Sequence, residues 1–237
     1  MIRLITAAET PCFSGPLYIR VMSYLNSYGI EYNFARFYLQ YIEDKVTALL
    51  SIIDDNATVV TKADADASEI AEFLSAVCVK SVLSDVALPL NNGTKLSAFS
   101  KNYEKAESIY NGFDFKRAYS LLLHLDESLN YDSWYVDLSH RLRHNGAVAI
   151  SIDDGCVCAA KSGSQLLITG IAVSPDKRRS GIGKKLLDSA VSQSNADCVW
   201  ALTDEAEAKK FYLGCGFDEK QAVYYYKTEE ENGAEIF

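Results

Sequence analysis

The sequence is poor in the residues that bind transition metals. It contains three histidines (His124, His140 and His144) and six cysteines among 237 residues. The nearest approach to a metal motif is Cys156-Val157-Cys158, whose spacing is shorter than the usual two-residue gap and which has no second Cys pair nearby. We therefore expect no metal site and interpret the two thiols as alternate residues on one face of a strand.

The cysteines are also too few for a disulfide scaffold in a chain of this length. The first residues, Met1-Ile2-Arg3-Leu4, contain no long apolar segment of the kind that directs secretion. We expect free thiols and a cytoplasmic location. The residues concerned are Cys12, Cys78, Cys156, Cys158, Cys198 and Cys215.

Positive charge is scarce, because 23 basic residues face 32 acidic ones and the formal net charge is -9. Sequence-independent binding of nucleic acid needs a basic face, so we expect no nucleic-acid partner. No apolar run approaches the roughly 20 residues of a membrane span, so we expect no membrane insertion. Hydrophobic residues make up 49% of the chain, which is typical of a folded globular protein of one large or two small domains.

What the second half does contain is a regular succession of helix and strand signals. Asp114 and Asp132 are expected to cap two helices, the first with Leu125 on its apolar face and the second ending before Gly146. Asp153-Asp154-Gly155 predicts a hairpin turn. The expected order is ααβββαβαβ, with strands at 147–152, 156–160, 166–173, 199–202 and 223–227, and later helices at 184–191 and 205–215.

The first half repeats this order more loosely, which suggests a duplicated domain. We expect a helix at 16–28, strands at 36–42, 45–53 and 57–62, a helix at 68–77 and a strand at 79–83. Pro89 to Thr94 is a loop signal and Asn111-Gly112 is a turn. We predict a boundary near 111–116, with lobes 1–113 and 114–237. The alternative is that two α+β segments look alike by coincidence.

The most informative segment follows the strand that ends at Val173. It runs from Ser174-Pro175 through a basic, glycine-containing loop into an amphipathic helix. Free N–H groups at a helix start and the positive end of the helix dipole favour an anion. Two glycines, Gly181 and Gly183, allow a diphosphate to approach the backbone. Five cations lie within nine residues: Lys177, Arg178, Arg179, Lys184 and Lys185.

Arg178-Arg179-Ser180-Gly181-Ile182-Gly183 matches the pattern Arg/Gln-x-x-Gly-x-Gly/Ala and resembles the acetyl-CoA site of the GCN5-related N-acetyltransferase (GNAT) superfamily. A second segment, from Ala208 through Tyr212 to Gly216-Phe217, resembles the helix end of the same family. The resemblance covers about residues 116–230. It implies that acetyl-CoA is held by Ile171, Ala172, Val173, Arg178, Arg179, Ser180, Gly181, Ile182, Gly183 and Lys184.

The resemblance also implies a fold and a mechanism. The fold is α+β, a three-layer arrangement around a mixed central sheet of acetyltransferase type, here as two tandem acyl-CoA N-acyltransferase-like lobes. Tyr212 is implied as the general acid toward the thiolate, since a phenol stays protonated at neutral pH. The alternative for Tyr212 is plain packing of a helix on the sheet. The acceptor would be an amine of a small molecule or peptide.

Two positions depart from the family pattern. Glu205 stands where many members have Asn, and the strand Leu167 to Ile171 has no carboxylate that could act as general base. We assign no base, and the oligomeric state is not readable. Two alternatives to the enzyme stay open: a non-catalytic acyl-CoA-binding module on the same fold and an unrelated phosphate-binding α+β protein.

The corresponding loop of the first half, Lys62 to Glu69, has no glycine and three acidic residues. Its carboxylates would repel a diphosphate. We therefore expect one cofactor site, in the second half only.

Overall fold

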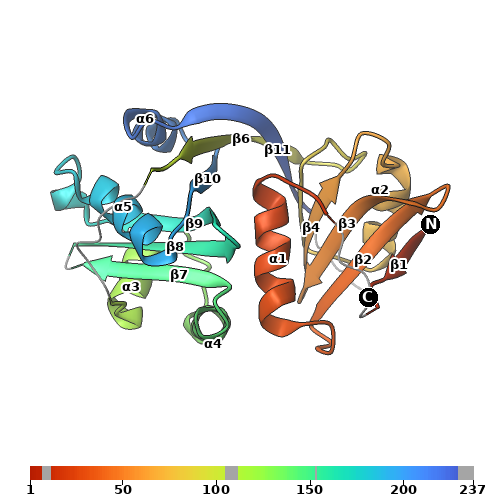
Figure 1. The fold of residues 1–237 in the computed structure, drawn as a ribbon, viewed down its shortest axis with the longest axis horizontal. Coiled ribbons are helices and arrows are strands. Elements are labelled where there is room, and N and C mark those ends of the chain that lie inside the picture. The colour runs from red at the N-terminus through yellow and green to blue at the C-terminus, as the bar shows by residue number, and fades with distance from the viewer. Residues whose placement is uncertain (7–11, 105–111, 153, 229–237) are drawn as a thin grey trace, which may run out of the picture.

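The two halves of the chain build one continuous sheet of 11 strands, with helices on both faces (Figure 1). The computed structural model describes residues 1–6, 12–104, 112–152 and 154–228. Asn111 of the expected turn and Asp153 of the expected hairpin lie outside the described residues. The first half occupies the right of Figure 1 and the second half the left.

The elements of the first half are β1 (Ile2–Leu4), α1 (Pro16–Tyr28), β2 (Ala35–Ile42), β3 (Lys45–Ile53), β4 (Asn56–Thr61), α2 (Ala67–Ala76), β5 (Ser81–Ser84) and β6 (Gly93–Asn102). The six elements expected from α1 to β5 are confirmed. The sequence did not predict β1 or β6. The loop signal ending at Thr94 was wrong for its last two residues, because Gly93 and Thr94 begin β6.

The second half contains α3 (Phe115–Leu122), α4 (Tyr131–Arg143), β7 (Ala147–Ile152), β8 (Gly155–Ser162), β9 (Gln165–Val173), the 3₁₀ turn η1 (Pro175–Lys177), α5 (Ile182–Ser194), β10 (Cys198–Thr203), α6 (Ala206–Gly214) and β11 (Asp218–Lys227). The expected order is confirmed. Asp114 caps α3 by accepting a hydrogen bond from the Arg117 N–H. Leu125 lies beyond the end of α3 and is exposed.

The cap expected at Asp132 was wrong. The side chain of Asn130 caps α4 by accepting a hydrogen bond from the Ser133 N–H at 3.1 Å. Asp132 lies in the first turn of the helix, where its negative charge interacts favourably with the positive end of the helix dipole.

The halves exchange strands at the centre of the sheet. The strand order is β1-β2-β3-β4-β5-β11-β6-β10-β9-β8-β7. The last strand of the first half, β6, therefore pairs with β10 of the second half, and β11 of the second half pairs with β5 of the first. In Figure 1 β6 and β11 cross the top of the molecule as the bridge between the halves. This pattern relates the halves by an approximate two-fold axis.

Helix α1 provides a second connection between the halves. It packs on β2 and β4 and also covers β8 and β9, between the two halves in Figure 1. Gly146 allows this contact, because a Cβ at that position would lie 2.7 Å from the Ser23 carbonyl oxygen. The helices α1, α3 and α4 share one face of the sheet, while α2, α5 and α6 cover the other, as the alternation of residues between the apolar clusters shows.

Candidate active site

The parallel strands β9 and β10 separate before β9 ends. Their pairing runs from Gln165↔Cys198 to Ile168↔Ala201. At that point the pairing of β9 with β8 shifts register and Thr169 becomes the extra residue of a bulge. Thr169 is exposed although it lies inside a large sheet. Beyond it, Ile171–Val173 continue in register with β8 alone, so their side toward β10 is an open strand edge.

The basic loop follows directly on this edge. The Arg178 Nε donates to the carbonyl of Val173 at 3.3 Å, and the Ser180 hydroxyl donates to the carbonyl of Lys177 at 2.6 Å. Arg179 and Gly181 have positive φ values of 64° and 84°. The loop thereby turns sharply into α5, and the backbone requires glycine at position 181, where a Cβ would meet no other atom within 4 Å.

The N-terminus of α5 has no side-chain cap. Its cap residue is Gly181, and the first turn contains no acidic residue. The free N–H groups and the dipole are therefore available to an anion. Position 183 requires glycine for a different reason, because a Cβ there would lie 2.8 Å from the Phe211 ring. That glycine allows α5 to approach α6 closely.

The cations of the loop are exposed, and one of them, Arg179, forms an ion pair with a residue of α6. Arg179 pairs with Glu207 at 2.7 Å, and Lys210 pairs with the same carboxylate at 2.8 Å. The two cations lower the pKa of Glu207. Lys177 lies 4.0 Å from Asp176. The sequence patterns did not reveal Glu207, whose spacing of three residues from Lys210 was the only available signal.

Tyr212 lies in the apolar core between α6 and the sheet. It is 5% exposed. Its ring is 6.2 Å from Phe99 and 5.3 Å from Phe217, measured between centroids. Burial raises its pKa above the ordinary value, so the phenol keeps its proton at neutral pH. The structure thus gives Tyr212 a packing role, and any chemical role concerns its hydroxyl group alone.

The cysteines of the second half are free. Cys156 and Cys158 lie in one apolar cluster, as expected of alternate residues on a strand face. Burial raises the pKa of Cys156 to about 12 and raises that of Cys158 as well. Both stay as thiols at neutral pH and are poor nucleophiles. In the described part of the chain, no group of three or more His, Cys, Asp and Glu residues could hold a metal ion.

The first half contains the corresponding strand pair, and there the edge is closed. β4 and β5 pair over four residues, from Asn56↔Ser81 to Val59↔Ser84, as β9 and β10 do. β4 keeps a regular register with β3 and has no bulge. Asp85 accepts hydrogen bonds from the Thr61 N–H at 3.0 Å and from the Thr61 hydroxyl at 2.9 Å. The Thr61 N–H at this strand edge thus already donates to a side chain of the protein, Asp85.

The N-terminus of α2, the helix after β4, is also capped by a carboxylate of the chain itself. Asp66 caps α2 by accepting hydrogen bonds from the N–H groups of Ser68 and Glu69, each at 3.0 Å. Glu69 adds a second acidic group in the first turn. An anion at this N-terminus would meet two negative charges.

An open strand edge that leads into an uncapped, basic helix start has the shape and charge that an extended ligand with phosphate groups requires. Comparison with known proteins adds a similarity in sequence and in fold. Residues 134–219 match the model of the acetyltransferase (GNAT) domain. A search against curated proteins gave no match.

Similar folds occur among solved structures. A tandem GNAT protein from the clavulanic acid biosynthesis pathway is 10% identical with a TM-score of 0.53, covering 91% of this chain and 95% of that one. A GCN5-related N-acetyltransferase from Sphaerobacter thermophilus is 10% identical with a TM-score of 0.56, covering 96% and 95%. A GNAT acetyltransferase from Colwellia psychrerythraea is 11% identical with a TM-score of 0.52, covering 97% and 100%.

Residues 134–219 of the second half are thus similar to the GNAT acetyltransferase domain, and the chain as a whole shares its α+β fold with a tandem GNAT protein. Among the described residues, no helix is long and apolar enough to cross a membrane.

Proposed function

We propose that this protein is an N-acetyltransferase that moves the acetyl group of acetyl-CoA to a primary amine of a small-molecule or peptide acceptor. The observation that carries the proposal is the continuous site from the open edge of β9 to the uncapped N-terminus of α5. The edge suits the amides of a pantetheine arm. The helix start and its cations suit a diphosphate. The residues proposed to bind are Ile171, Ala172, Val173, Arg178, Arg179, Ser180, Gly181, Ile182, Gly183 and Lys184.

In the proposed mechanism, the main chain of Ile171–Val173 aligns the thioester and one of its N–H groups polarises the carbonyl. The amine attacks the acetyl carbon directly, and the carbon–sulfur bond breaks without a covalent enzyme intermediate. Tyr212 supplies the proton that the departing sulfur needs, and its raised pKa means that the phenol is protonated at neutral pH. The amine proton passes to solvent or to a base that we do not assign.

A non-catalytic acyl-CoA-binding module is the second candidate. Two observations favour it: β9 carries no carboxylate between Gln165 and Val173, and the Tyr212 side chain is nearly inaccessible. In this alternative the same loop binds the cofactor and no acetyl group is transferred.

The proposal includes two lobes, 1–113 and 114–237, with cofactor binding confined to the second. The closed edge at Asp85 and the capped α2 support this assignment. A cytoplasmic site of action is supported by the free state of all six cysteines.

Two measurements test the proposal. Thermal shift with acetyl-CoA, CoA and ATP tests binding, and only the two CoA species are expected to stabilise the protein. Thiol release with a panel of amino acids, polyamines, aminoglycosides and peptides tests transfer. Binding without release for any amine would favour the non-catalytic module. No stabilisation by either CoA species would refute both candidates.

A further inference from the structure

A second candidate site lies at the outer edge of the first half, far along the sheet from β9. There the short edge strand β1 leaves β2, and the chain segment 30–33 turns back toward the sheet. A cavity of about 380 Å³ lies between them. Its lining consists of Leu4, Ile5, Ile30, Tyr32, Asn33, Arg36, Phe37 and Tyr38. Most of these side chains are apolar or aromatic, as is usual for small-molecule sites.

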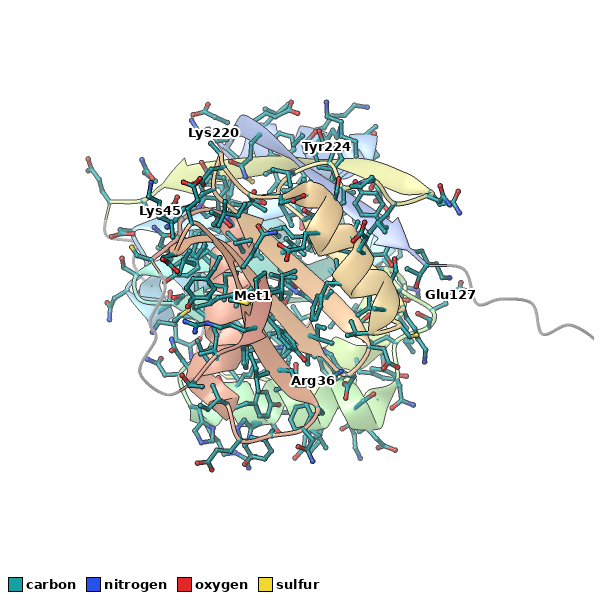
Figure 2. The ribbon with its side chains drawn as sticks, turned by 90° about the vertical axis from the view of Figure 1, so that its right-hand side faces the viewer. Met1, Arg36, Lys45, Glu127, Lys220 and Tyr224 are labelled. Atoms are coloured by element: carbon teal, nitrogen blue, oxygen red, sulfur yellow. The ribbon has the colours of Figure 1, made fainter. Side chains whose placement is uncertain are left out.

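One cation, Arg36, lines the cavity. The Arg36 side chain is half-buried, and its Nε is completely buried without a hydrogen-bond acceptor among the described residues. Figure 2 shows Arg36 on the outer face of the first half, with Met1 and Lys45 on the same side. The buried Arg141 differs from Arg36, because it forms a close ion pair with Asp137.

A buried guanidinium nitrogen without an acceptor is unusual in a protein with a net charge of -9. Buried donors are normally satisfied, so the hydrogen bonding of Arg36 is incomplete within the described residues. Guanidinium groups bind carboxylates through two parallel hydrogen bonds, and Arg36 is the residue of the cavity lining that carries such donors. One cation with an apolar lining matches a singly charged acid better than a phosphate with two charges.

From this geometry we propose that the cavity beside β1 binds a small organic carboxylate, with its acid group on Arg36 and its aromatic or aliphatic body against Leu4, Ile30 and Tyr32. Leu4, Ile30 and Tyr32 are exposed, so the apolar body of the ligand would bury part of their surface. The site is independent of the proposed acetyl transfer.

Thermal shift and calorimetry on the full chain test this proposal with benzoate, phenylacetate and hexanoate as probes, against benzamide as the neutral analogue. We expect the acids to raise the melting temperature and benzamide to have no effect. Arg36→Gln should weaken binding about ten-fold or more, and Arg36→Lys should weaken it less, because the charge stays but the paired geometry is lost. Lys45→Gln is the matched control, since it removes one positive charge from the exposed first residue of β3 on the same side of the molecule.

Two results would overturn the proposal. One is the absence of any shift with all three acids up to about 10 mM, a concentration that detects even weak sites. The other is equal binding by the wild type and Arg36→Gln. Light scattering adds a further outcome: if the chain dimerises and Arg36→Gln makes it monomeric, a second copy covers the cavity instead, and the carboxylate proposal fails.

Discussion

The Asp85 carboxylate holds the backbone N–H and the hydroxyl of Thr61 and so joins the end of β5 to the end of β4. In the second half, the strand edge at the equivalent place is open, because β9 bulges at Thr169 and separates from β10. One carboxylate and one missing bulge thus distinguish two halves of similar topology.

This difference predicts the stoichiometry of cofactor binding. Calorimetry should give one CoA per chain, because at the equivalent place in the first half Asp85 closes the strand edge and Asp66 caps α2. Asp85→Ala should lower the free energy of unfolding by about 1–3 kcal/mol, since the Thr61 donors lose their partner. It should not create a second site, because Asp66 still caps α2. Two CoA molecules bound to the wild type would contradict the assignment.

Gly181→Asp tests the phosphate loop. We expect CoA affinity to fall at least 100-fold, because the new carboxylate would lie at the helix start that the diphosphate needs. Gly163→Asp is the matched control. Gly163 also has a positive φ, 57°, and open space around it, but it lies in the turn between β8 and β9. Both variants should lose about 1 kcal/mol of stability, and equal loss of binding in the two would show that the loop is misassigned.

The sequence predicted what depends on neighbours along the chain. The Asp114 cap, the turn at Gly181 and the helix that follows each rest on a few consecutive residues, and each forms where expected. The contact between Asp85 and Thr61 joins positions 24 residues apart, and Arg179 meets Glu207 across 28. No local pattern specifies such pairs, because they form only when the strands and helices have taken their places.

The ion pair between Arg179 and Glu207 predicts a gain of affinity on substitution. Glu207→Gln should strengthen CoA binding about two- to five-fold, because an exposed ion pair that competes with phosphate for Arg179 is weak. Glu205→Gln removes the same charge two residues earlier, at the N-cap of α6, and should change affinity less. Calorimetry at low salt measures both. Weaker binding by Glu207→Gln would mean instead that Glu207 positions Arg179 for the ligand.

Tyr212→Phe separates chemistry from packing. The ring contacts with Phe99 and Phe217 stay, so stability should change by less than about 1 kcal/mol. If the hydroxyl is the general acid, kcat should fall about 100-fold with an active amine, while KM for acetyl-CoA stays similar. Tyr103→Phe, which removes another hydroxyl from a side chain packed on the same core, is the control. An unchanged kcat in Tyr212→Phe would leave this tyrosine with packing alone.

The exchange of β6 and β11 predicts which fragments fold. Residues 114–237 include every helix and strand of the second half, yet β6, which pairs with both β10 and β11, belongs to residues 93–102. Without it two strands lose their common partner, and Phe99 leaves a hole in the core around Tyr212. We therefore expect 114–237 to show no cooperative melting by circular dichroism and no CoA binding, whereas 92–237, which restores β6, should recover both. A fragment 114–237 that melts cooperatively and binds CoA as the full chain does would show that the second half is self-sufficient and that the strand exchange contributes little to its stability.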